Sequence, residues 1–172
     1  MSNDTQNIIR HWREAVPNDR MAHLIRDTER AFRRALQIRL ATHAVPFGHW
    51  SFLRILWEAD GLTQKELSER AGVMEPTTFT AMKAMEALGY IVRKQLPTNK
   101  KNMYVYLTDV GRALKEKLVP MAEEANHVSV EGLSPEDIKT TRKVLLAMIE
   151  NLARDELGRA APLRKTAAGK IR

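Results

Sequence analysis

Apolar residues recur at every third or fourth position between residues 20 and 44, which predicts a long amphipathic helix. Its apolar stripe consists of Met21, Leu24, Ile25, Thr28, Ala31, Phe32, Ala35 and Leu36. The opposite face is charged and consists of Arg26, Glu29, Arg30, Arg33 and Arg34. We expect Pro46 to end this helix, because proline cannot continue one. The preceding residues 1–19 are polar, and four apolar positions indicate a short helix there: Ile8, Ile9, Trp12 and Val16.

The pattern of apolar residues over residues 48–89 predicts three helices, which are separated by residues that break helices. The first covers residues 48–59, and its core consists of Phe52, Leu53, Ile55 and Leu56. Thr63 and Glu66 form a capping box that starts a short second helix, which Gly72 ends. Pro76 opens the third helix, and Gly89 ends it in the left-handed conformation. The inner faces of these two short helices consist of Leu67, Ala71, Thr78, Ala81, Met82 and Met85. A pair of short helices joined by a glycine turn is typical of a helix-turn-helix.

The period changes to that of β-strands after residue 90. Residues 91–95 and 103–107 are runs of β-branched and aromatic residues, and residues 96–102 between them are rich in turn formers. This pattern predicts a β-hairpin, and a hairpin directly after a helix-turn-helix is a winged helix. Two further helices follow, one capped by Thr108 and running to about His127, the other starting at Ser134-Pro135 and running to about Leu157. The inner face of the last helix consists of Ile138, Leu145, Met148, Ile149 and Leu152.

Composition excludes several classes of protein. The chain has 172 residues, the size of about one domain, and its longest apolar run, residues 144–149, is far shorter than the roughly 20 residues of a membrane span. The polar N-terminus offers no stretch for a signal peptidase, and the absence of cysteine excludes disulfides, thiolate zinc sites and thiol catalysis. None of the five histidines has metal-ligand spacing, and no nucleotide loop or nucleophile motif is present. We therefore expect a cytoplasmic protein that is not an enzyme and holds no metal or cofactor.

The net charge of +7 favours a polyanionic partner only weakly. Residues 159–172 hold five basic and no acidic side chains, which leaves about +2 for the rest of the chain. The placement of individual charges must therefore decide whether the chain binds nucleic acid.

Four segments in order resemble the MarR family of bacterial transcription regulators. They are residues 62–67, residues 71–73, residues 85–93 and residues 107–114, and Trp50 with Leu53 fits the same pattern. The resemblance covers about Met21 to Leu157. It implies a triangular homodimer on a pseudo-palindromic operator, usually a repressor, which in many relatives releases DNA when a small aromatic acid binds between the dimerisation helices and the DNA-binding lobe.

The expected fold class is mainly α with a small β-hairpin wing, a winged helix-turn-helix lobe plus a helical dimerisation region. Residues 1–19 are then an N-terminal extension, residues 48–107 the DNA-binding lobe, and residues 158–172 a basic, flexible tail. The dimerisation region combines residues 20–44 with residues 109–157.

The expected DNA surface combines the outward face of the third short helix with the wing. It consists of Lys65, Pro76, Thr77, Phe79, Thr80, Lys83, Arg93, Lys94, Asn99, Lys100 and Lys101. The first turns of such a helix reach base edges in the major groove, and the wing cations meet phosphates without an acid among residues 93–101. A solvated helix face and a solvated hairpin edge are the alternatives. Phe79 either packs on a thymine methyl group or fills the core.

The wing departs from the family pattern. Relatives usually carry Asp-x-Arg there, whereas this chain has Asn99, Lys100 and Lys101. Lysine offers phosphate a point charge but lacks the planar fork that suits a narrow minor groove. We therefore expect a phosphate contact from the wing.

The expected effector site is a cation between aromatic walls and consists of Arg39, His43, His49, Trp50, Arg54 and Trp57. Trp50, Arg54 and Trp57 share one helix face, an arrangement that suits a flat carboxylate. The alternative is that both tryptophans belong to the core. The expected partners are therefore double-stranded operator DNA, a second copy of the chain, and an aromatic carboxylate or its coenzyme A thioester. The rival function is a winged-helix protein-interaction module without specific DNA binding.

Overall fold

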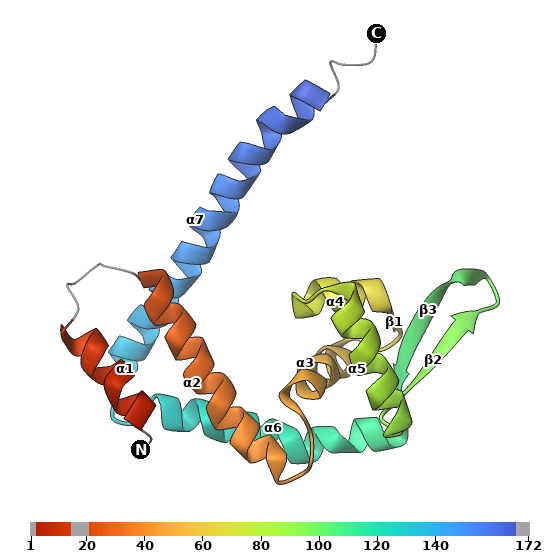
Figure 1. Ribbon diagram of the computed structural model, residues 1–172, viewed down its shortest axis with the longest axis horizontal. Coiled ribbons are helices and arrows are strands. Elements are labelled where there is room, and N and C mark those ends of the chain that lie inside the picture. The colour runs from red at the N-terminus through yellow and green to blue at the C-terminus, as the bar shows by residue number, and fades with distance from the viewer. Residues whose placement is uncertain (1–2, 15–20, 168–172) are drawn as a thin grey trace. The chain divides into compact units, whose positions relative to one another are not determined.

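The computed structural model describes residues 3–14 and 21–167, with the side chains of residues 5–14, 21–99 and 101–159 (Figure 1). Val16, expected in the first short helix, lies outside the described residues. The chain divides into two compact units, residues 1–129 and residues 130–172. No helix in the described ranges is long and apolar enough to cross a membrane.

The first unit begins with α1 (Asn3–Glu14) and α2 (Met21–Ala41), which a side-chain hydrogen bond joins. The indole N–H of Trp12 donates to Asp27 Oδ2 over 3.1 Å. Because Ala44 takes a left-handed conformation (φ 54°) and Val45 N–H bonds back to the Leu40 carbonyl, α2 ends before Pro46. Pro46 stands instead at the N-cap of the next helix, so the prediction that it ends α2 was wrong.

The apolar stripe of α2 is only partly covered in the single chain. Leu40 is the one fully buried residue of this helix in the described chain, whereas Met21, Leu24, Ile25 and Phe32 are each more than a third exposed. The predicted apolar stripe is therefore present, and the protomer alone does not supply the surface to bury it.

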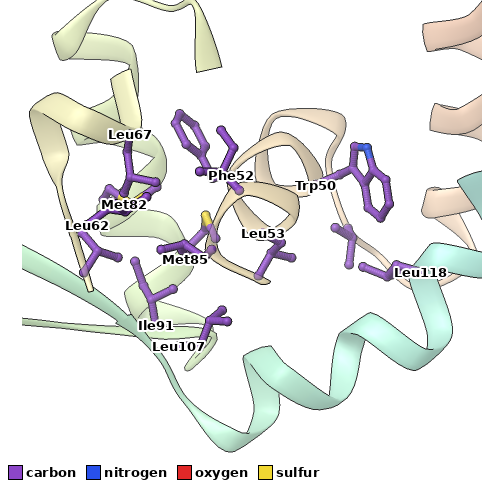
Figure 2. Close-up of a cluster of buried hydrophobic side chains, with 14 of the residues drawn as sticks. Trp50, Phe52, Leu53, Leu62, Leu67, Met82, Met85, Ile91, Leu107 and Leu118 are labelled. Atoms are coloured by element: carbon purple, nitrogen blue, oxygen red, sulfur yellow. The ribbon is translucent and has the colours of Figure 1, made fainter. Parts of the chain in front are cut away.

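The core of the first unit gathers around α3 (Phe47–Glu58), as Figure 2 shows. Phe52, Leu53, Ile55 and Leu56 are buried as predicted. Trp50 joins them, and the core continues into the helix-turn-helix and the sheet through Leu62, Leu67, Met82, Met85, Ile91 and Leu107. This packing fixes the orientation of the helix-turn-helix on the rest of the unit.

The helix-turn-helix consists of α4 (Gln64–Ala71) and α5 (Glu75–Ala87). The predicted capping box is present: Thr63 Oγ1 accepts from Glu66 N–H over 3.2 Å, and Glu66 Oε2 accepts from Thr63 N–H over 2.7 Å. Gly72 and Gly89 both have positive φ angles, which confirms them as helix terminators.

The sheet has three antiparallel strands in the order β1-β3-β2. β2 (Ile91–Leu96) and β3 (Asn99–Leu107) form the predicted hairpin, while β1 (Leu62–Thr63) was not predicted. The turn is also shorter than the predicted turn of residues 96–102. β2 continues to Leu96 and β3 begins at Asn99, so only residues 97 and 98 lie between the strands. The register passes from Gln95 opposite Met103 to Leu96 opposite Asn99, so residues 100–102 bulge from β3.

α6 (Asp109–Ser129) closes the first unit and packs on α2 and α3. Thr108 caps it as predicted, because its hydroxyl accepts from Gly111 N–H over 3.1 Å. Asp60 ties this end of α6 to the sheet: its carboxylate accepts from Leu107 N–H over 2.9 Å and from the Arg112 guanidinium over 2.8 Å.

The second unit consists mainly of α7 (Pro135–Ala167). Ser134 Oγ accepts from Asp137 N–H over 3.1 Å, which confirms the predicted cap, but the helix continues ten residues beyond the predicted end at Leu157. Leu145, Ile149 and Leu152 were predicted to face inward, yet they are exposed in the single chain.

Candidate functional site

One face of α5 is buried against the core, and the opposite face is exposed to solvent. Thr78, Met82 and Met85 are buried, which confirms them as the inner stripe. The predicted outward residues are all exposed: Pro76, Thr77, Phe79, Thr80 and Lys83. The helix therefore offers an exposed surface along its first two turns.

Phe79 is 45% exposed, so it does not fill the core. Two cations lie near its ring. Lys83 Nζ lies 4.7 Å from the ring centroid, and the guanidinium carbon of Arg93 lies 6.0 Å from it. These contacts bring a residue of β2 against the outward face of α5.

Arg93 is held by Glu86, the penultimate residue of α5. Arg93 Nε donates to Glu86 Oε2 over 2.9 Å, and the Arg93 backbone N–H donates to Glu86 Oε1 over 3.1 Å. The Arg93 side chain holds the pKa of Glu86 below its ordinary value, aided by the backbone hydrogen bond and opposed by partial burial. The expectation of four uncompensated wing charges was therefore wrong, because Glu86 outside the hairpin compensates one of them.

Asn99 organises the wing. Its Oδ1 accepts from the N–H groups of Lys101 and Asn102 over 3.2 Å and 3.3 Å, and its Nδ2 donates to the Tyr104 hydroxyl over 3.2 Å. The side-chain amide thus stabilises the bulge that carries the lysines. Lys94 and Lys101 are exposed, whereas the side chain of Lys100 lies outside the described residues.

Lys65 lies on α4 and is also exposed. Its Nζ is 3.9 Å from Glu69 Oε1, one helical turn away. Such exposed ion pairs are weak, so this contact leaves the ammonium available to another anion.

Two neighbouring cavities lie at α3: the first, of about 330 Å³, between α2, α3 and α6, and the second, of about 290 Å³, between α3 and α6. Both are lined by Trp50, Arg54, Ala122 and Asn126. The Trp50 and Trp57 rings meet edge to face, with centroids 5.7 Å apart, and Trp57 Nε1 donates to the Gly111 carbonyl over 2.9 Å. Trp50 thus belongs to the core and to a cavity wall at the same time.

The structure brings together only half of the predicted effector residues. Trp50, Arg54 and Trp57 line the cavities, whereas Arg39, His43 and His49 line neither. Arg39 instead donates to the Ala35 carbonyl over 3.0 Å and to Glu124 Oε1 over 3.1 Å.

The two histidines have separate surroundings. His43 lies in the turn after α2. His49 is half-buried in the first turn of α3, where burial lowers the pKa of its imidazole. Its Nδ1 has no hydrogen-bond partner among the described residues.

Sequence reasoning missed several cavity residues because they come from other helices. Arg33 was assigned to the outer face of α2, yet its guanidinium carbon lies 5.0 Å from the centroid of the Phe47 ring at the first cavity. Lys115 of α6 lines the second cavity. The spacing of residues along α3 gave no signal for either of them, because Arg33 lies on α2 and Lys115 on α6. Within the described residues, no group of three His, Asp or Glu side chains could hold a metal ion.

Comparisons with known proteins place this architecture in a family. The MarR family model matches residues 48–103. The chain is 32% identical over 129 residues to the HTH-type transcriptional regulator TtmR of Methylorubrum extorquens, an alignment that covers 74% of this chain and 62% of that relative. It is 30% identical over 108 residues to the organic hydroperoxide resistance transcriptional regulator of Bacillus subtilis, covering 63% of this chain and 72% of that protein.

A solved structure of similar fold is that of a MarR family regulator from Listeria monocytogenes complexed with 26mer DNA. Its TM-score is 0.70 at 25% identity, covering 88% of this chain and 97% of that chain. The chain belongs to the MarR family of DNA-binding transcriptional regulators. This membership confirms the expected fold class and the expectation that the chain is not an enzyme.

Proposed function

We propose that this chain is a homodimeric, sequence-specific repressor that a small aromatic carboxylate, or its coenzyme A thioester, releases from a pseudo-palindromic operator. The observation that carries the proposal is the exposed outward face of α5 together with the exposed wing lysines Lys94 and Lys101. Figure 1 shows the ribbon of α5 near the hairpin of β2 and β3. A helix of this diameter fits the major groove, where its first turns meet base edges. The DNA complex of the Listeria relative supports the same use of this fold.

The wing lysines supply phosphate contacts. Lys94 and Lys101 are exposed, and Lys100 shares the bulge with Lys101. Lys65 on α4 adds a further cation. Arg93 is left out of this set, because Glu86 already neutralises its guanidinium by accepting from Nε over 2.9 Å.

The homodimer follows from the apolar faces that the single chain leaves exposed. α2 exposes Met21, Leu24, Ile25 and Phe32, and α7 exposes Leu145, Ile149 and Leu152. Residues 20–44 and 109–157 therefore form the dimerisation region, and residues 48–107 form the DNA-binding lobe. We call α5 the recognition helix, because it is the helix that would enter the major groove. A dimer places two recognition helices about one DNA turn apart, roughly 34 Å, which matches an operator of two half-sites.

Neutralising the wing tests the DNA-binding surface. The double variant K94Q/K101Q removes four charges from a dimer, so the slope of log K against log salt should become shallower by up to about 3.6. The matched control is K117Q/K139Q, which makes the same charge change on exposed positions of α6 and α7 and should leave the slope unchanged. Unchanged DNA binding in K94Q/K101Q would favour the protein-interaction module.

The effector site is the pair of cavities around Arg54. The exposed guanidinium lies in the wall shared by both cavities, so it can bind a carboxylate while Trp50 and Trp57 contact the ring. Arg33 and Lys115 add positive charge, which suits the phosphates of a coenzyme A thioester. Because α6 lines the cavities and leads directly from the wing, a ligand here favours a different spacing of the two recognition helices. By linkage, operator DNA weakens ligand binding by the same factor.

The substitution Arg54→Gln tests this site. Benzoate, phenylacetate and their coenzyme A thioesters are titrated against the protein–operator complex, and at least one of them should weaken operator binding by wild type. R54Q should bind operator as wild type does but lose this response, while the control R142Q on α7 keeps it. An equal response in R54Q and wild type would exclude this role for Arg54.

A further inference from the structure

The exposed ring of Phe79 belongs to a connected group of side chains on α5 and β2. Leu88, the C-cap residue of the same helix, is also exposed, at 51%. Lys83 Nζ lies 4.7 Å from the centroid of the Phe79 ring, and the guanidinium carbon of Arg93 lies 6.0 Å from it. A cation near an aromatic face is attracted by the ring's quadrupole, so both contacts hold the ring in place.

Glu86 makes this support rigid. It fixes Arg93 through two of its oxygens, one of them bonded to the Arg93 backbone N–H over 3.1 Å. The Arg93 side chain is only 18% exposed, in contrast to the solvated lysines of the wing. An arginine that is fixed by Glu86 therefore supports the ring of Phe79, and Phe79 itself is about half exposed to solvent.

We propose that Phe79 is the specificity-determining residue that reads the C5 methyl group of a thymine in each operator half-site, with Lys83, Arg93 and Glu86 as its positioning residues. This inference rests on the proposed DNA binding. The thymine methyl is the one apolar group that the four bases present in the major groove, and a rigid ring is its natural partner. The cations around the ring match the anionic groove and keep the ring in place while it is still in water.

A wedge inserted between base pairs is a different use of an exposed aromatic residue. Such wedges enter the minor groove and kink the duplex. Phe79 lies instead on the second helix of a helix-turn-helix, which docks in the major groove. Contact with a base edge therefore fits its position better than insertion.

Replacing thymine by deoxyuridine, which lacks only the methyl group, tests the assignment. Each thymine of a promoter fragment protected by the protein is replaced in turn, and binding is measured for wild type, Phe79→Ala and the matched control Leu88→Ala. Wild type and L88A should lose about fourfold in affinity at one thymine per half-site, the fold-change of burying one methyl group. F79A should bind the thymine and deoxyuridine duplexes equally.

The outcomes separate this inference from the proposed function. Promoter-specific binding by wild type that no deoxyuridine weakens would overturn the role of Phe79 and leave the repressor intact. A deoxyuridine effect that persists in F79A would assign the methyl contact to another residue and equally overturn it. Binding without any promoter preference would overturn the repressor and this inference together.

Discussion

At the scale of single residues, Glu86 links the recognition helix to the wing through one carboxylate. Its pKa lies below the ordinary value of 4.5, first because the Arg93 side chain donates to it, with the Arg93 backbone N–H adding to the effect. A carboxyl group whose pKa is lowered by folding stabilises the fold above its unfolded pKa. That contribution is lost as the pH falls through the lower, folded pKa.

The variant Glu86→Gln should therefore show a weaker acid dependence. Its free energy of unfolding, measured by urea titration at fixed protein concentration, should fall less than that of wild type between about pH 6 and about pH 3. Glu150→Gln, on an exposed position of α7, serves as the matched control and should follow wild type. Identical pH dependence in E86Q and wild type would contradict this account of the pair.

The site could be predicted from the sequence only where one helix carries it. The outward set on α5 followed from the period of its buried residues, and Trp50, Arg54 and Trp57 from their spacing on α3. The pairing of Arg93 with Glu86 crosses a turn between two elements, and Arg33 enters the cavity from another helix. Neither contact has a signature in local spacing, so both were missed.

At the scale of elements, Gly111 is the tightest point where the first turn of α6 meets the sheet. A Cβ atom there would overlap the backbone carbonyl oxygen of Tyr90, which also accepts from Thr108 N–H over 3.1 Å. The carbonyl of Gly111 itself accepts from the Trp57 indole. The absence of a side chain therefore lets α6, the sheet and α3 come together.

Gly111→Ala should lower the free energy of unfolding by roughly 1–3 kcal/mol, the range for overpacking a dense site. Gly158→Ala provides the control, because nothing lies within 4 Å of a Cβ at that helical position. That variant should be stabilised by up to about 1 kcal/mol through helix propensity. Urea unfolding of both variants makes the comparison, and wild-type stability in G111A would contradict the close approach.

The starts of the helices could be predicted because their causes are local. The ends of α2 and α7 and the strand β1 could not be predicted. The capping box at Thr63 and the cap at Ser134 lie within four residues of sequence. The turn after α2 contains a left-handed alanine, Ala44, which carries none of the glycine signal that marked Gly72 and Gly89. β1 exists because Leu62 pairs with Val105, more than forty residues away.

At the scale of the whole molecule, the apolar surface of α7 requires a partner in the proposed assembly. Ile149 is 64% exposed and Leu152 70% exposed in the single chain. The double variant I149E/L152E should yield a monomer by light scattering at micromolar concentration, because it places charges where the dimer would bury apolar area. E150Q, between these positions on an exposed site, should remain dimeric, and a dimer of I149E/L152E would contradict this interface.

The most direct test of the account is equilibrium binding of the full chain to DNA from its own promoter region and to a scrambled duplex of equal length and composition. Both titrations are repeated over a series of salt concentrations. The account predicts tight binding that prefers the promoter, with a steep salt dependence from the wing lysines. Weak and equal binding to both duplexes would contradict it, because the exposed face of α5 would then read no sequence.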